Sequence, residues 1–96
     1  MRWSWDPRKA AANRAKHGLS FETAVHVFDD PLHASKPHPH PDGDRWQTIG
    51  AVGPVLLLVI HTRPAADPEG DDSVGRIISA RKATAHERRA YEEGSF

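Results

Sequence analysis

Two stretches near the start of the chain have apolar and polar residues at helical spacing. Asp6 followed by Pro7 is typical of a helix N-cap and first helical position, and Gly18 is typical of a helix end, so we predict a helix over residues 7–17. Ser20 is a second candidate N-cap. The apolar residues that follow it at helical spacing, and that predict a second, amphipathic helix, are Phe21, Ala24, Val25 and Phe28.

From residue 32 the pattern changes to one typical of strands. Residues 32–36 are predicted to form a short edge strand, and residues 45–52 alternate well enough to form a longer one. A Gly-Pro turn then leads into residues 55–60, which are continuously apolar, as expected for a central strand covered on both faces. Residues 74–80 have a similar apolar character, and we expect them to pair with this central strand across a long hairpin.

The chain ends in a third helical signal. Thr84 with Glu87 three residues later forms the pattern of a capping box, Tyr91 is predicted to lie on the same face as Glu87, and Gly94 is expected to end the helix. The predicted fold is therefore α+β. It consists of two N-terminal helices, a mostly antiparallel sheet of three to four strands and one C-terminal helix, within a single domain over residues 1–96.

Composition limits the class of protein further. The chain has no cysteine, which excludes disulfides and thiolate metal sites, and it has no long apolar run or signal-peptide pattern. These features predict a soluble cytoplasmic protein with no membrane partner. The 13 basic and 13 acidic residues balance, but residues 64–73 hold four of the acids, so the remainder of the chain is basic and suited to a polyanion such as RNA.

Cations crowd the predicted junction between the last strand and the last helix. Arg76 is carried by the strand, Arg81 and Lys82 follow it, and Thr84 begins a helix whose free amide groups attract anions. We therefore predict a phosphate-binding site here. The alternative is that Arg81 is a structural salt-bridge partner and that Arg88 and its neighbour are solvated helix residues.

Strand geometry places a condition on this site. In a regular strand Arg76 and Arg81 project from opposite faces, because side chains alternate with a period of two. The two guanidinium groups can serve one ligand only if the chain turns between them. We therefore predict a bend near Ala80.

Several segments in order resemble one known family. The segments that carry this resemblance are WDPRKAAANRAKHGLSFETAVHVFDDP, DRWQTIG, LLLVIHT, and RIISARKAT with ERRAY. Through them the chain resembles the BrnT family of type II toxins over nearly its whole length. The resemblance implies a RelE-like fold and a ribonuclease activity that arrests translation. It also implies neutralisation by a BrnA-type antitoxin, which itself binds operator DNA, and it implies no metal or other cofactor.

Metal-free RNA cleavage requires charge stabilisation and proton transfer. The 2′-hydroxyl must lose a proton, the phosphorane must be stabilised, and the 5′-oxygen must gain a proton. Guanidinium groups match phosphate geometry, and the predicted stabilisers are Arg45, Arg76 and Arg81. The candidates for proton transfer, among which the sequence does not choose, are Lys82, His61, Glu87 and Tyr91.

RNA-binding residues are expected beside these groups. Trp46 next to Arg45 can form a platform for an unpaired base, although burial in the core is an equally good interpretation of the indole. Arg88 is a further candidate RNA contact. A catalytically inactive domain whose basic face binds nucleic acid or a partner protein is the alternative to the nuclease function.

The remaining histidines are interpreted as structural. His33, His38 and His40 cluster in HASKPHPHP, but the prolines favour an extended, solvent-exposed loop, and no carboxylate or cysteine completes a zinc-like spacing. His17 is expected to interact favourably with the dipole at a helix end, and His26 to lie within the second helix. We expect the acidic stretch and this loop to be peripheral departures from the family pattern.

Overall fold

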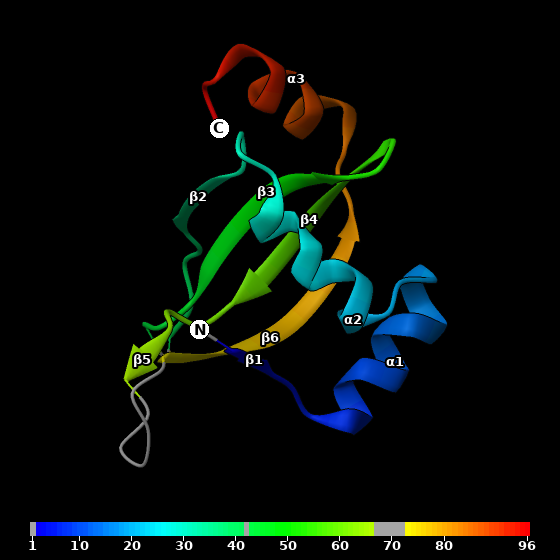
Figure 1. Cartoon of the computed structure of the whole chain (residues 1–96), viewed down its shortest axis with the longest axis vertical. Coiled ribbons are helices and arrows are strands. Elements are labelled where there is room, and N and C mark those ends of the chain that lie inside the picture. The colour runs from blue at the N-terminus through cyan, green and yellow to red at the C-terminus, as the bar shows by residue number, and fades with distance from the viewer. Residues whose placement is uncertain (1, 42, 67–72) are drawn as a thin grey trace.

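The computed structural model describes residues 2–41, 43–66 and 73–96, and it has a mixed β-sheet at its centre (Figure 1). Neighbouring strands follow the order β1-β6-β4-β3-β2, with the short β5 attached to β6. All pairs are antiparallel except β1 with β6, which is parallel. The strands are β1 (Arg2–Ser4), β2 (Ala34–Pro37), β3 (Trp46–Val52), β4 (Val55–His61), β5 (Ala65–Ala66) and β6 (Ser73–Lys82).

Three short helical segments pack on one face of the sheet, which we call the first face (Figure 1). They are α1 (Pro7–His17), α2 (Phe21–Ala24) and the 3-10 helix η1 (Val25–Asp29). Apolar side chains of the helices and the sheet form the core between them, and its buried members are Phe21, Ala24, Val27, Leu57, Val59, Ile77 and Ala80.

The opposite, second face carries the alternate residues of the same strands and is contacted by the C-terminal end of the chain. Ile49 and Leu58 are paired on this face and are buried. The helix α3 (Ala85–Glu93) follows β6 directly, and Phe96 beyond it lies 4.3 Å from the ammonium of Lys36 on β2. Both faces of the central strands are thus covered in part, as the continuous apolar run of β4 predicts.

The predicted caps of the first and last helices are confirmed. The Asp6 carboxylate accepts a hydrogen bond from the Arg8 amide, and Gly18 ends α1 with a φ of 70°. Thr84 and Glu87 form the predicted capping box, and Gly94 ends α3. The α+β prediction is confirmed with these elements.

The structure differs from the expectation in the second helix, in the number of strands and in the start of the edge strand, and its sheet includes the short β5, which was not predicted. The second helix tightens into the 3-10 helix η1 at Val25, and the sheet gains β1, which pairs in parallel with β6 and was not predicted. The predicted edge strand begins two residues later, at Ala34. The acids predicted to form a charged loop, at positions 67–72, lie outside the described residues.

An irregularity in β6 places Arg76 and Arg81 on the same face. Ile77 is paired with His61, whereas Ser79 is paired with Ile60, so β6 contains an extra residue between the two pairs. One extra residue reverses the alternation of side chains. Because of it, Arg76 and Arg81 both project from the second face. The turn that we predicted near Ala80 is therefore replaced by a β-bulge slightly earlier in the strand.

Candidate functional site

The side chain of Asn13 holds α1 against the open edge of β6. Its amide nitrogen donates to the carbonyl of Ala80 at 2.9 Å, and its carbonyl oxygen accepts from the Ala80 amide at 3.1 Å. β1 pairs with β6 only as far as Arg76, so no strand among the described residues lies beside this part of the edge on that side. A carboxamide has both a donor and an acceptor. Buried Asn13 therefore pairs with the N–H and C=O groups of this strand edge as a residue of a neighbouring strand would.

A groove of about 480 Å³ runs between α1 and this edge, and we call it the edge groove. Lys9, Lys16 and His17 line it from α1, and Ser79 and Arg81 line it from β6. No carboxylate is among its described lining residues. Such a concentration of basic side chains without acids is suited to a phosphate chain.

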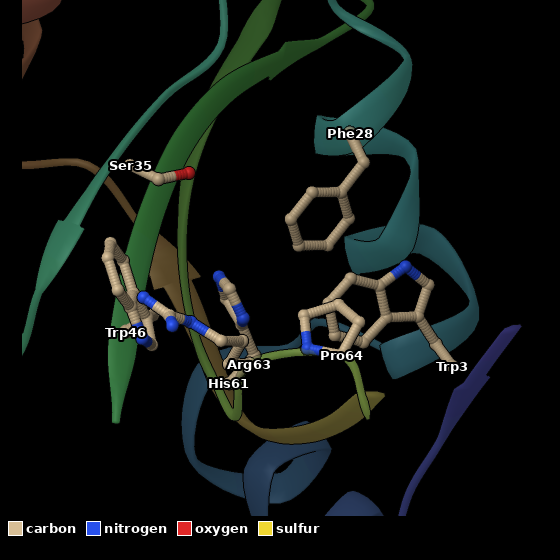
Figure 2. A pocket seen from close by; sticks show the side chains of 7 residues that line it. All are labelled: Trp3, Phe28, Ser35, Trp46, His61, Arg63 and Pro64. Carbon is tan, nitrogen blue, oxygen red and sulfur yellow. The ribbon is translucent and has the colours of Figure 1, made fainter. Parts of the chain in front are cut away.

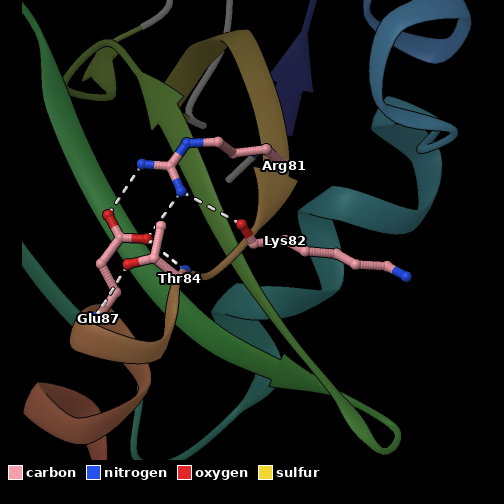
Figure 3. Close-up of polar contacts among 4 residues, drawn as sticks. All are labelled: Arg81, Lys82, Thr84 and Glu87. Carbon is pink, nitrogen blue, oxygen red and sulfur yellow. Dashed lines mark hydrogen bonds and ion pairs between the residues drawn. The ribbon is translucent and has the colours of Figure 1, made fainter.

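The guanidinium of Arg81 is fixed by Glu87 at the start of α3 (Figure 3). Nη1 donates to Oε1 at 2.7 Å and to the carbonyl of Lys82 at 3.2 Å, and Nη2 donates to Oε2 at 2.8 Å. Oε1 also accepts from the Thr84 amide as part of the capping box. The beginning of α3 and the orientation of Arg81 therefore depend on one carboxylate.

Arg81 retains donors for a ligand despite this ion pair. Within the described part of the chain, Nε–H and the second hydrogen of Nη2 have no acceptor, and these two donors lie on the same edge of the planar group. The Arg81 side chain is 38% exposed. A phosphate can thus bind the free edge in a bidentate manner while Glu87 holds the other edge.

Glu87 itself is better suited to positioning than to proton transfer. The hydrogen bonds from Arg81 are the main reason that its pKa falls to about 2, and the same pairing raises the pKa of Arg81. A carboxylate with so low a pKa is a weak base near neutral pH. The proton-transfer role predicted for Glu87 stays a hypothesis without support from this geometry.

The side chains of Arg76 and Lys82 do not join the guanidinium of Arg81, which contacts Lys82 only through the main-chain carbonyl. Arg76 is exposed on the same face, about 15 Å away along the strand, and its main chain bonds to Thr62. Lys82 is exposed and is paired with Leu57, which places it on the first face. Arg76 and Arg81 therefore suit successive phosphates of a chain better than a single one, and Lys82 lies on the opposite face of the sheet.

Tyr91 and Arg88 lie on α3 away from the edge groove. The hydroxyl of Tyr91 donates to Oδ2 of Asp30 at 2.6 Å, and the same oxygen accepts from the Ala51 amide. This hydrogen bond is the main cause of a lowered pKa for Asp30 and a raised pKa for Tyr91. Tyr91 thus links α3 to the segment after η1. Arg88 is exposed.

His61, Trp46 and Arg45 gather at a different place, around the ends of β3 and β4. His61 is 5% exposed and contacts Thr48 through Nε2, and together with Trp46 it lines a pocket on the first face. Trp46 also borders a neighbouring hollow, which Arg45 lines. The predicted residues thus form two groups on separate parts of the sheet.

Sequence reasoning missed the contribution of α1. Lys9, Asn13 and Lys16 recur at helical spacing on one side of this helix, and this spacing is the signal that could have identified them. His17 was interpreted as a favourable helix-end residue, and the structure adds that it lines the edge groove. Among residues 2–41, 43–66 and 73–96, no group of three or more side chains is arranged to hold a metal ion.

Replacing Glu87 by Gln is expected to lower the free energy of unfolding by about 1.5–3 kcal/mol at pH 7, because a charge-assisted pair is lost. The pKa of Glu87 is lowered from 4.5 to about 2, so its stabilising contribution is complete above pH 4.5 and is lost as the pH falls toward 2. Urea unfolding at pH 7 and pH 3 measures both effects. Exposed Glu92→Gln is the control, and an equal loss in both variants contradicts the assignment.

Burial lowers the pKa of His61 below 6.5, so the folded protein favours its neutral form. The contribution of neutral His61 to the free energy of unfolding is complete above pH 6.5. It is lost as the pH falls below 6.5, because the unfolded chain binds the proton first. We expect the wild-type protein to lose stability in urea between pH 7.5 and pH 5.5, and His61→Gln to lose less. Exposed His86→Gln is the control, and a slope that is unchanged in His61→Gln argues against this origin.

Comparison with known proteins identifies the family. A family model described as "Ribonuclease toxin, BrnT, of type II toxin-antitoxin system" matches residues 5–87. No curated protein sequence matches the chain. Within the described residues, no helix has the length and apolar character needed to cross a membrane. The family match spans both the segment that forms α1 and the segment that forms β6, and the chain therefore belongs to the BrnT family of ribonuclease toxins of type II toxin–antitoxin systems.

Proposed function

We propose that this toxin is an endoribonuclease that holds the scissile phosphate in the edge groove and cleaves it by attack of the adjacent 2′-hydroxyl, without a metal ion. The observation that carries this proposal is the free, bidentate edge of Arg81 in a groove lined by Lys9, Lys16 and His17 and by no described carboxylate. The family supplies the reaction class, ribonuclease, and the groove supplies a place for it.

Arg81 stabilises the charge that develops on the phosphorane. Its guanidinium is oriented by Glu87 before the substrate arrives, so little reorganisation accompanies the reaction. The ammonium groups of Lys9 and Lys16 contribute further positive charge along the groove. Arg76 lies further along the same face and binds a neighbouring phosphate.

His17 is the proton-transfer group that we assign. An imidazole can exchange protons near neutral pH, and it lines the same groove as Arg81. In the proposed reaction His17 accepts the proton of the 2′-hydroxyl, the 2′-oxygen bonds to phosphorus, and the bond to the 5′-oxygen breaks. Lys16 gives a proton to that 5′-oxygen. The products are a 2′,3′-cyclic phosphate and a 5′-hydroxyl.

The proposed partner is an antitoxin of the BrnA type. The family implies an antitoxin, and a cationic groove is complementary to an acidic segment that can cover it and exclude RNA. Operator DNA is then bound only through the antitoxin. We place the toxin in the cytoplasm, where its RNA substrate and the antitoxin are made.

Purified protein incubated with RNA in the presence of a chelator tests the reaction. We expect fragments that end in 2′,3′-cyclic phosphate, a loss of about 10²–10³-fold in cleavage rate for Arg81→Ala and of at least about 10²-fold for His17→Ala. Arg14→Ala removes a cation from the same helix that does not line the groove, and it should cleave as the wild type does.

A second arm uses translating ribosomes, because a ribosome can supply the geometry that naked RNA lacks. Cleavage in this arm alone still supports the proposal if the same variants are inactive and retain the wild-type melting temperature. Intact RNA in both arms, with only a mobility shift, identifies a binding domain instead. Cleavage that stops on addition of the chelator contradicts the metal-free mechanism.

A further inference from the structure

A second cavity, of about 250 Å³, lies on the first face of the sheet, and we call it the aromatic pocket (Figure 2). It is near the lower end of the usual size range for small-ligand pockets, which begins at about 300 Å³, so it suits a single planar group. No acid is among its described lining residues, which are Trp3, Phe28, Ser35, Trp46, His61, Arg63 and Pro64.

One wall of the pocket is a packed aromatic cluster. The rings of Trp3 and Phe28 are stacked at 4.4 Å between centroids, and His61 meets each of them edge-on at 5.1 Å. Trp3 lies over Gly75, where a Cβ atom would come within 2.4 Å of the indole. The wall is therefore held from behind by contacts that leave little space for movement.

The other wall is formed by Trp46, which lies across the pocket from Trp3 and Phe28 (Figure 2). The guanidinium carbon of Arg63 lies 4.9 Å from the centre of the Trp46 ring. A half-buried indole with a guanidinium stacked on it is a surface on which an unpaired base can stack.

A chain of hydrogen bonds determines whether the Ser35 hydroxyl can donate to a ligand in the pocket or accept from it. The carbonyl of Thr62 can only accept, so Nδ1 of His61 carries the proton in their 2.8 Å bond. In the neutral ring Nε2 is then an acceptor, and the hydroxyl of Thr48 donates to it at 2.7 Å. Ser35 must therefore donate to Thr48 Oγ1, at 2.6 Å, and its own lone pairs remain available.

We propose that the aromatic pocket binds one unpaired base of the RNA substrate between Trp46 and the Trp3–Phe28 wall, and that Ser35 accepts a hydrogen bond from an exocyclic amino group of that base. The proposal rests on the proposed ribonuclease function, since it names a subsite for the same substrate. It assigns Ser35 and Trp46 to specificity, at a site separate from the edge groove.

Charge favours a base of a nucleic acid over an apolar side chain of a protein. The hollow that adjoins the pocket shares Trp46 and Arg63 with it and is also lined by Arg45 and His38, and Asp44 is the one acid among its described lining residues. A base that enters the pocket brings its own phosphate to this mainly basic mouth.

Titration of the intact protein with CMP and UMP, followed by tryptophan fluorescence, tests the inference. Trp3 and Trp46 line the pocket whereas Trp5 does not, so stacking should quench the signal. CMP presents an amino group where UMP presents a carbonyl oxygen, and we expect CMP to bind about 5-fold more tightly. Ser35→Ala should remove this preference, and Trp46→Leu should weaken both ligands by about 5-fold or more. Ser95→Ala, outside the pocket, is the control.

The outcomes separate this inference from the proposed reaction. If CMP quenches the fluorescence but the protein does not cleave RNA, the base-binding pocket is supported and the ribonuclease mechanism fails. If the protein cleaves RNA but neither nucleotide quenches the fluorescence, the mechanism stands and the base-binding pocket is overturned. Equal binding of CMP and UMP, or a preference that survives in Ser35→Ala, overturns the assignment of Ser35. Quenching by ribose 5-phosphate as strong as that by CMP shows that the base is not recognised and overturns the inference.

Discussion

The contact between Asn13 and the main chain of Ala80 determines where the candidate site lies. It satisfies a donor and an acceptor on a strand edge that no described strand covers, and it fixes α1 against that edge. The cations of α1 and of β6 then face one groove. These hydrogen bonds add to the packing of Ala10 against the core in setting the position of Lys16 relative to Arg81.

An ion pair and a β-bulge shape the chemistry of that groove. Glu87 binds one edge of Arg81 and also caps α3, so the helix end and the guanidinium are positioned by the same group. The bulge in β6 brings Arg76 to the same face as Arg81 but leaves the two well separated along the strand. In the proposed reaction the two arginines contact successive phosphates, with Arg81 at the reacting one. It departs from the simpler picture of several arginines around a single phosphate.

The sequence was sufficient for features that depend on neighbouring residues. Asp6, Pro7 and Gly18 define α1, and Thr84 with Glu87 defines the start of α3, because caps are local hydrogen bonds. Long-range pairing was not visible. β1 is three residues long and has no periodic pattern. The close approach of η1 to β3 depends on Gly50, because a Cβ at this position would lie 2.6 Å from the carbonyl oxygen of Val27. Likewise Arg81 was identified from charge clustering, whereas His17 entered the site only through the packing of α1.

The most direct test of the account is whether a phosphate binds the free edge of Arg81. The protein can be titrated with a 2′-O-methyl RNA trinucleotide, which cannot react, while the Nε–H signal of each arginine is followed by nitrogen-15 NMR. We expect the Arg81 signal to move downfield with saturation and the signal of Arg14, which does not line the groove, not to move. A trinucleotide that binds without moving the Arg81 signal would contradict it.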